Sequence, residues 1–172
     1  HVSGDSVKHV ALHVSQQSRD FQYYTDIDEF WRLCRGSDEM LKRSQLLTEV
    51  VFDDHLTVDT LCEYKVLVLS NSGCLADSQV DAIREFVNRG GCLIATHQTS
   101  LFDELGQERS NFGLAEVLGV DHVAGDKQKT IDSKDGAMIP GKANIIVPQT
   151  EDLRGMFGHF VAFEAAQSEI AI

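Results

Sequence analysis

Five side chains that could do chemistry follow one short apolar run in the middle of the chain. The run, residues 92–95, stands directly after Gly90 and Gly91, and the polar residues behind it are His97, Thr99, Ser100, Asp103 and Glu104. An imidazole next to hydroxyls and carboxylates suits general acid–base or nucleophilic chemistry. The same residue types also cap helices and form ion pairs, which is the favoured interpretation here, with Arg109 pairing with Asp103 or Glu104.

Cys74 offers a second route to chemistry, because it follows another apolar run, 65–69. A Cys74 thiolate with His97 as its base would make a small cysteine-dependent hydrolase or amidotransferase-like enzyme. A buried or half-buried loop cysteine is the plainer interpretation. The four cysteines have no CxxC spacing, so neither a zinc site nor a disulfide framework is expected, and Cys62 and Cys92 are predicted to be buried.

Metal and cofactor sites are not indicated elsewhere. Asp53, Asp54 and His55 are adjacent and would point in different directions, so a solvated loop is the preferred interpretation. His9 and His13 share one face of a predicted strand, about 13 Å apart, which is too far for one ion. The chain has neither a GxGxxG loop after a strand nor a GxSxG elbow, so we expect no cofactor.

Composition narrows the class of protein. The chain has 172 residues, and its 27 acidic against 15 basic side chains give a formal net charge of −12, which argues against a nucleic-acid partner. No apolar run reaches the ~20 residues of a membrane helix, so a cytoplasmic protein without a membrane partner is expected. Because the chain begins at His1 rather than Met, residues 1–172 are predicted to be one domain excised from a longer chain.

Alternating helical and strand periodicities run along the first 120 residues. Residues 15–28 look like a loop, and Thr57 is placed to cap a short helix that buries Leu61. Predicted strands are 7–14, 50–52, 65–69 and 92–95, and predicted helices are 29–49 with a break at Gly36, 77–89 ending at Gly90, and 112–118 ending at Gly119. Later strands are predicted at 143–147, 159–163 and 168–172.

This order predicts a three-layer α/β fold, a flavodoxin-like or Rossmann-like parallel sheet with helices on both faces, to which the C-terminal part could add antiparallel strands. Ligands of such sheets bind beyond the carboxyl ends of the strands. The polar residues predicted there give a third hypothesis, a sugar- or metabolite-binding module whose pocket uses Gln16, Asn71, His97 and Ser100.

The segment from Leu61 to Val120 resembles the class I glutamine amidotransferase-like domain found as the trimerisation domain of bacterial beta-galactosidases. Weaker similarity extends back to Val7. The resemblance rests on YKVLVL at 64–69, LAD at 75–77, FV at 86–87 with the glycine pair, AT at 95–96, TSL at 99–101, DE at 103–104, Gly106, Arg109 and FGLA at 112–115.

The resemblance implies a non-catalytic member. Class I amidotransferases carry a nucleophilic cysteine on a sharp turn directly after the strand that matches 92–95, and here the turn reads ATHQT. They also take a His and a Glu one residue apart from a late segment, whereas His159 and Glu164 are five apart. The resemblance therefore implies a homo-oligomeric assembly domain of a carbohydrate-active protein, or one that shapes a neighbouring sugar site, with any carbohydrate ligand bound through the parent protein.

Overall fold

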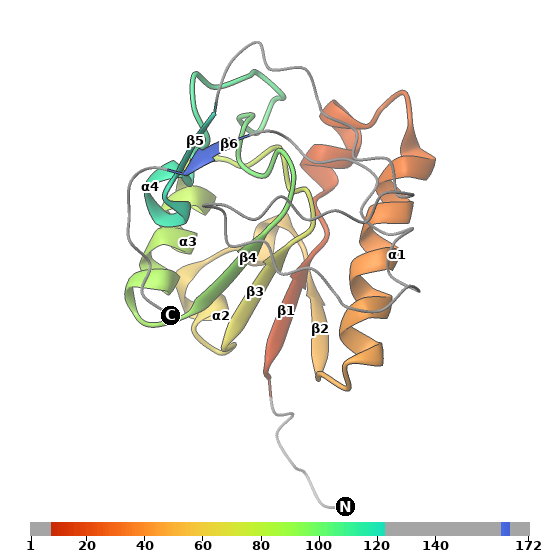
Figure 1. Cartoon of the computed structure of the whole chain (residues 1–172), viewed down its shortest axis with the longest axis vertical. Helices are drawn as coiled ribbons and strands as arrows, with labels where there is room; N and C mark the ends of the chain where they lie inside the picture. Colours follow the sequence, from red (N-terminus) through yellow and green to blue (C-terminus); the bar gives the residue numbers. More distant parts are fainter. Residues whose placement is uncertain (1–7, 123–162, 166–172) are drawn as a thin grey trace, which may run out of the picture.

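Four short parallel strands form the centre of the protein (Figure 1). The structure is a computed structural model that describes residues 8–122 and 163–165. The strands are β1 (Val10–His13), β2 (Thr48–Val51), β3 (Val66–Leu69) and β4 (Cys92–Ala95). Their order across the sheet is β2-β1-β3-β4, the start of a doubly wound flavodoxin-like order.

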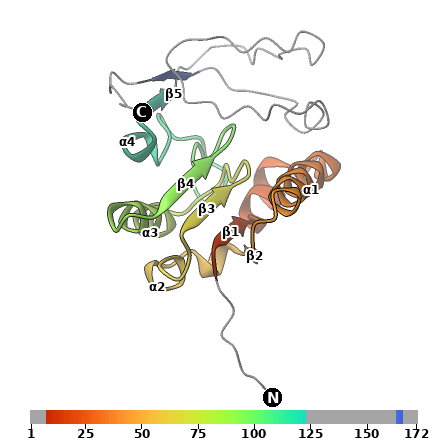
Figure 2. The ribbon, with the colours of Figure 1, turned by 60° about the horizontal axis from the view of Figure 1, so that its bottom comes forward.

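Helices cover both faces of this sheet, as Figure 2 shows. On one face α1 (Ile27–Arg43) places Leu41 against Val10, Leu12 and Val68. On the other face α2 (Val58–Leu61) and α3 (Asp77–Asn88) pack on the strand residues whose side chains point away from α1, including Leu67. Successive side chains of a strand point to opposite faces, so an apolar strand such as β3 serves two cores. The predicted three-layer α/β fold is confirmed.

The helix α1 runs unbroken through Gly36, which corrects the predicted interruption. Phe30, Cys34 and Leu41 recur at helical spacing and are buried, and their packing outweighs the weak helix propensity of one glycine. Gly36 is itself buried, where the helix passes close to the end of β3: the next residue, Ser37, has its hydroxyl 2.7 Å from that of Ser70.

Residues 15–28 are not a plain loop. They contain a π-helical turn, η1 (Ser18–Gln22), and the start of α1, whose first turn is capped by the Asp26 side chain accepting from the Glu29 N–H. The expected Thr57 cap is present, because the Thr57 side chain accepts from the Thr60 N–H at the start of α2. A short 3-10 turn, η2 (Asp53–His55), joins β2 to this region.

The two glycines before β4, Gly90 and Gly91, have different structural roles. Gly90 has φ of 93° and ends α3 in the left-handed region, as predicted for a helix cap. Gly91 leaves room for the ring of Phe86, a buried residue that is 2% exposed. A Cβ built on Gly91 would lie 2.3 Å from two carbons of that ring. The close passage of the chain over Phe86 therefore needs a residue without a side chain.

The segment after β4 ends in a short helix and an antiparallel pair of strands. Helix α4 (Ala115–Leu118) is shorter than predicted but ends as expected at Gly119, with φ of 64°. Strands β5 (Val120–His122) and β6 (Phe163–Ala165) pair antiparallel in a separate two-stranded sheet. The predicted strands 143–147 and 168–172 lie outside the described residues, as does 159–163 apart from Phe163.

Cys62 and Cys92 are exposed, so the prediction that both are buried is wrong. Cys62 stands at the C-terminal cap of the one-turn helix α2, and Cys92 begins β4, which has a strand neighbour on one side only in the described sheet. In the part of the chain that the structure describes, no helix is both long and apolar enough to cross a membrane.

Candidate functional site at the carboxyl edge of the sheet

The register of the sheet brings four connecting segments to one edge. His13, Val51, Leu69 and Ala95 end their strands in one row across the sheet. The residues that follow them, from Ser15, Asp53, Ser70 and Thr96 onward, therefore meet at the carboxyl edge, where ligands of such sheets bind.

The turn after β4, residues 96–99, is a sharp elbow that contains no cysteine. The backbone of His97 in this turn has φ of 56°, a left-handed conformation that residues other than glycine rarely adopt. The turn is held by the Thr96 N–H donating to the Leu69 carbonyl at 3.1 Å and by the Thr99 hydroxyl donating to the Thr96 carbonyl at 2.7 Å. Residues in such conformations cluster at functional sites, and here an imidazole occupies the position.

Asn71 joins three segments rather than facing a ligand. It is 2% exposed, its backbone N–H donates to the Thr96 hydroxyl at 3.0 Å, and its side-chain oxygen accepts from the Gln98 N–H at 3.0 Å. Its side-chain nitrogen donates to the Tyr23 hydroxyl. Burial is also the main reason that the pKa of Tyr23 is raised, which keeps this hydroxyl neutral.

Ser100 is likewise part of the framework. It is fully buried, and its hydroxyl accepts from the Leu114 N–H at 3.1 Å. Its backbone N–H donates to the Ser72 carbonyl at 2.9 Å, and its carbonyl accepts from the Gly113 N–H at 2.8 Å. These bonds tie the loop after β4 to the loop after β3 and to the approach to α4.

Side chains of the protein fill the crevice between β1 and β3, where the order of the strands reverses. The Ser18 hydroxyl accepts from the Cys74 N–H at 3.0 Å, and the Gln22 amide donates to the Gln98 side-chain oxygen at 2.8 Å. A Cβ built on Gly73 would lie 2.2 Å from that Gln22 amide oxygen. The turn η1 therefore occupies the place at which doubly wound sheets bind ligands.

Cys74 has none of the features of an activated nucleophile. It is fully buried, and burial raises the pKa of its thiol to about 11, so the thiol is protonated at neutral pH. Cys34 is buried as well, and burial raises the pKa of its thiol to about 11.

We expect a chromogenic thiol reagent at neutral pH to modify only Cys62 and Cys92 quickly in the native protein. These two are exposed, whereas Cys34 and Cys74 are buried. All four thiols should react after denaturation. The control is the double variant Cys62→Ser/Cys92→Ser, which should lose the fast phase; a fast phase that survives in it would support a reactive Cys74.

Arg109 pairs with a different carboxylate from the ones expected. Its guanidinium lies 2.6 Å from an Asp77 side-chain oxygen and donates to the Leu75 carbonyl at 2.9 Å. Asp103 instead accepts from the N–H groups of Leu105 and Gln107 and closes its own turn. The expected pairing was wrong because Asp77 begins α3, a neighbour in space and not in sequence.

Asp53 is the most connected side chain of this edge, and sequence analysis missed its role. Its carboxylate accepts from the Ser15 hydroxyl at 3.0 Å and from the backbone N–H groups of Gln16 and Gln17 at 2.6 and 3.2 Å. One of its oxygens also lies 3.2 Å from Nε2 of His13. The Asp53 carboxylate, two residues after the end of β2, thus accepts from the segment that follows β1, and this pairing needed the strand order to be known.

His13 links Asp53 to Ser72 across the ends of three strands. Its Nδ1 lies 2.8 Å from the Ser72 hydroxyl oxygen, opposite the Asp53 contact. Serine, histidine and carboxylate in this order also make up a hydrolytic triad. Ser72 is only 1% exposed and His13 is 0% exposed, so no substrate reaches the hydroxyl, and the chain of contacts works as a brace for the edge.

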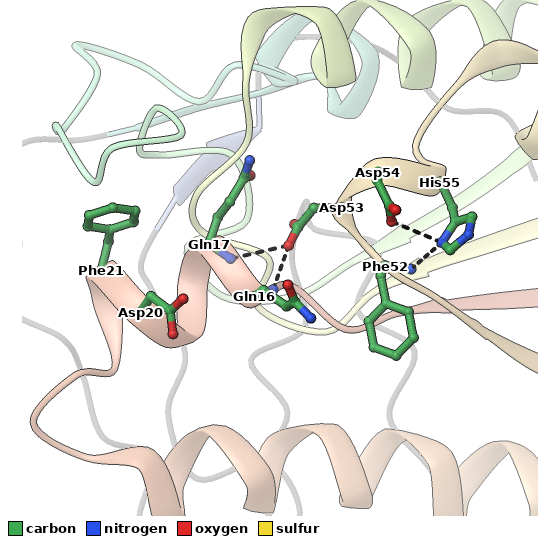
Figure 3. Close-up of a pocket in the computed structure, with 8 residues that line it drawn as sticks. All are labelled: Gln16, Gln17, Asp20, Phe21, Phe52, Asp53, Asp54 and His55. Atoms are coloured by element: carbon green, nitrogen blue, oxygen red, sulfur yellow. Dashed lines mark hydrogen bonds and ion pairs between the residues drawn. The ribbon is translucent and has the colours of Figure 1, made fainter.

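A cavity of about 460 Å³ opens beside Asp53 (Figure 3). It is lined by Gln16, Gln17, Asp20, Phe21, Phe52, Asp53, Asp54 and His55. Of the four residues predicted to bind a ligand, only Gln16 lines it; Asn71, His97 and Ser100 belong to other parts of the edge. Across the described ranges 8–122 and 163–165, no cluster of three or more His, Cys, Asp or Glu side chains is arranged to hold a metal ion.

Comparisons with known proteins bear on the fold alone. No protein-family model matches the chain, and no curated protein sequence matches it. Among solved structures, a beta-galactosidase from Bifidobacterium adolescentis matches with a TM-score of 0.58 and 18% identity over 74% of this chain and 63% of that chain.

The E323A catalytic mutant of Gan42B, a GH42 beta-galactosidase from G. stearothermophilus, matches with a TM-score of 0.53 and 16% identity over 78% of this chain. The match covers 20% of the Gan42B chain, so this chain spans a small part of that enzyme. The parallel α/β fold described above is therefore one that also occurs within beta-galactosidase chains.

Proposed function

We propose that this chain is a non-catalytic, amidotransferase-like domain of a glycoside-hydrolase-related protein, and that it serves the assembly of that protein. The observation that carries the proposal is the filled crevice between β1 and β3 at the carboxyl edge. The elbow after β4 holds His97, and Ser18, Gln22 and Tyr23 fill the crevice beside it. The fold shared with parts of beta-galactosidase chains supports the carbohydrate-related setting.

The chemistry of the thiols supports the non-catalytic part of the proposal. An amidotransferase needs a thiolate exposed at the elbow, with donors aimed at the oxyanion. The elbow residues 96–99 contain no cysteine. Cys74 follows the neighbouring strand, and its protonated, buried thiol does not replace that thiolate.

An exposed apolar face on α1 supports the assembly part. Ile27 and Trp31 are one helical turn apart and are 47% and 41% exposed, and Tyr24 just before the helix is 71% exposed. Large apolar side chains gathered on a surface are typical of protein contacts. We assign this face, Tyr24, Ile27 and Trp31, to contact with a second copy of the chain.

The variant Ile27→Asp/Trp31→Asp tests this assignment. A charge in a desolvated contact has no partner, so we expect the oligomer to dissociate at least tenfold more readily than the wild type. The measurement is sedimentation velocity across a dilution series. The matched control is Leu47→Asp, which changes a 63% exposed apolar residue next to β2 and should leave assembly unchanged. Equal effects of both variants would contradict the assignment.

A further inference from the structure

We propose that the cavity beside Asp53 is a binding site for a neutral polyhydroxylated ligand, a mono- or disaccharide. The site deepens the proposed function, because it gives a carbohydrate-related domain a sugar contact of its own. The cavity has about 460 Å³, within the roughly 300–1,000 Å³ of small-molecule pockets.

Contacts between segments far apart in the sequence hold the walls of the cavity in place. Asp53 accepts from Ser15, Gln16 and Gln17, and it lies 3.2 Å from the buried His13. Because both carboxylate oxygens of Asp53 are already engaged, this residue positions the others and is not the main ligand group. It fixes the first turn of the helical segment that carries the two glutamine side chains.

The glutamines supply the polar groups that the ligand would use. The side-chain oxygen of Gln17 is buried and has no hydrogen-bond partner among the described residues. A buried acceptor without a partner is costly and needs a donor from a ligand or from water. Gln16 is exposed at the mouth of the cavity, and its amide offers both a donor and an acceptor. Hydroxyl groups, which donate and accept, complement the exposed Gln16 amide.

Two phenyl rings supply the apolar surface. Phe21 is 46% exposed and Phe52 is 39% exposed, and in the view of Figure 3 they stand on either side of Gln16. A sugar ring carries C–H groups on its faces and hydroxyls on its rim. Such a ligand can cover a phenyl ring while its hydroxyls reach the glutamines, and the covered apolar surface favours binding.

The charges of the lining exclude other common ligands. Three carboxylates and no lysine or arginine line the cavity, so a phosphate-bearing ligand would be repelled. Each carboxylate also has a partner: Asp20 pairs with Arg19 at 2.7 Å, Asp53 lies against His13, and Asp54 is 3.1 Å from His55. The Arg19 charge beside Asp20 reduces the attraction for a free cation, and a neutral ligand with hydroxyl groups fits better.

The test is a titration of the isotope-labelled chain with galactose, glucose and lactose, followed by backbone amide NMR shifts. We expect saturable shifts at residues 16–21 and 52–55 at millimolar sugar. Phe52→Ala and Gln16→Ala should each weaken binding about fivefold or more. The matched control is Leu47→Ala, which truncates a 63% exposed apolar residue that does not line the cavity and should leave the affinity unchanged.

Three results would overturn the proposal: no saturable shift with any of the sugars, equal weakening by Leu47→Ala, or tighter binding of spermidine than of every sugar. The last would identify the cavity as a cation site. None of these depends on the solution mass or on thiol reactivity. If the chain forms an oligomer and Cys74 is unreactive but no sugar binds, the sugar site is contradicted while the proposed function stands.

Discussion

Replacement of Asp53 by alanine is expected to lower the free energy of unfolding by about 2–4 kcal/mol. The change leaves the Ser15 hydroxyl and the N–H groups of Gln16 and Gln17 without their acceptor, and it removes the contact of the fully buried His13. Each buried polar group that loses its partner costs about 1–3 kcal/mol. Urea unfolding followed by circular dichroism measures the effect.

The control for Asp53→Ala is Asp54→Ala. The Asp54 side chain is 81% exposed and touches only His55 among the pairs described, so its loss should change stability by less than about 0.5 kcal/mol. Equal losses from the two variants would mean that Asp53 does not brace the carboxyl edge.

The same brace predicts a dependence on pH. Burial tends to raise the pKa of Asp53, but His13, the Gln17 N–H and the Ser15 hydroxyl outweigh it and hold the pKa below its usual 3.8. Because the folded pKa is lowered, this stabilisation is complete above the unfolded value and is lost as the pH falls through the folded one. Asp53→Ala should therefore flatten the acid side of the stability curve, which urea unfolding between pH 2 and pH 7 measures.

Replacement of Gly91 by alanine is expected to cost up to about 3 kcal/mol, which is large for one methyl group. The new Cβ would lie within 2.5 Å of three ring atoms of Phe86, and that ring is 2% exposed and held in the core between α3 and the sheet. Neither the backbone before β4 nor the ring can move without disturbing the core. Thermal unfolding measures the loss.

Two further variants show whether the Gly91 effect is steric. Phe86→Leu should recover part of the loss in the Gly91→Ala background, because the smaller side chain frees the space, and a double-mutant cycle measures the coupling. Gly90→Ala should cost about 1–2 kcal/mol for a different reason, its φ of 93°, and Phe86→Leu should not rescue it. Rescue of Gly90→Ala, or no rescue of Gly91→Ala, would contradict this division of roles.

Local signals in the sequence predicted the elements that depend on local chemistry. Strand β4 was placed at its exact residues, α3 within one residue, and the Thr57, Gly90 and Gly119 caps were confirmed. Each rests on apolar periodicity or on a capping residue within a few positions, which a sequence displays directly.

The features that sequence analysis missed depend on contacts between distant segments. Gly36 appeared to break α1 because the packing that sustains the helix comes from the sheet. Asp53 looked like part of a solvated loop because its partners follow β1, about 37 residues earlier. The same carboxylate accepts from Gln17 just before the π-helical turn η1, and contacts to the loops after β3 and β4 stabilise the turn itself. The meeting of these loops at one edge was therefore predictable, whereas the contacts between them became visible only in three dimensions.

The solution mass of the unmodified chain tests the proposed function most directly. Light scattering across a concentration series should give a closed oligomer, such as three times the 19.1 kDa protomer mass, that persists on dilution. A constant mass of one protomer up to high concentration would contradict an assembly role for this domain.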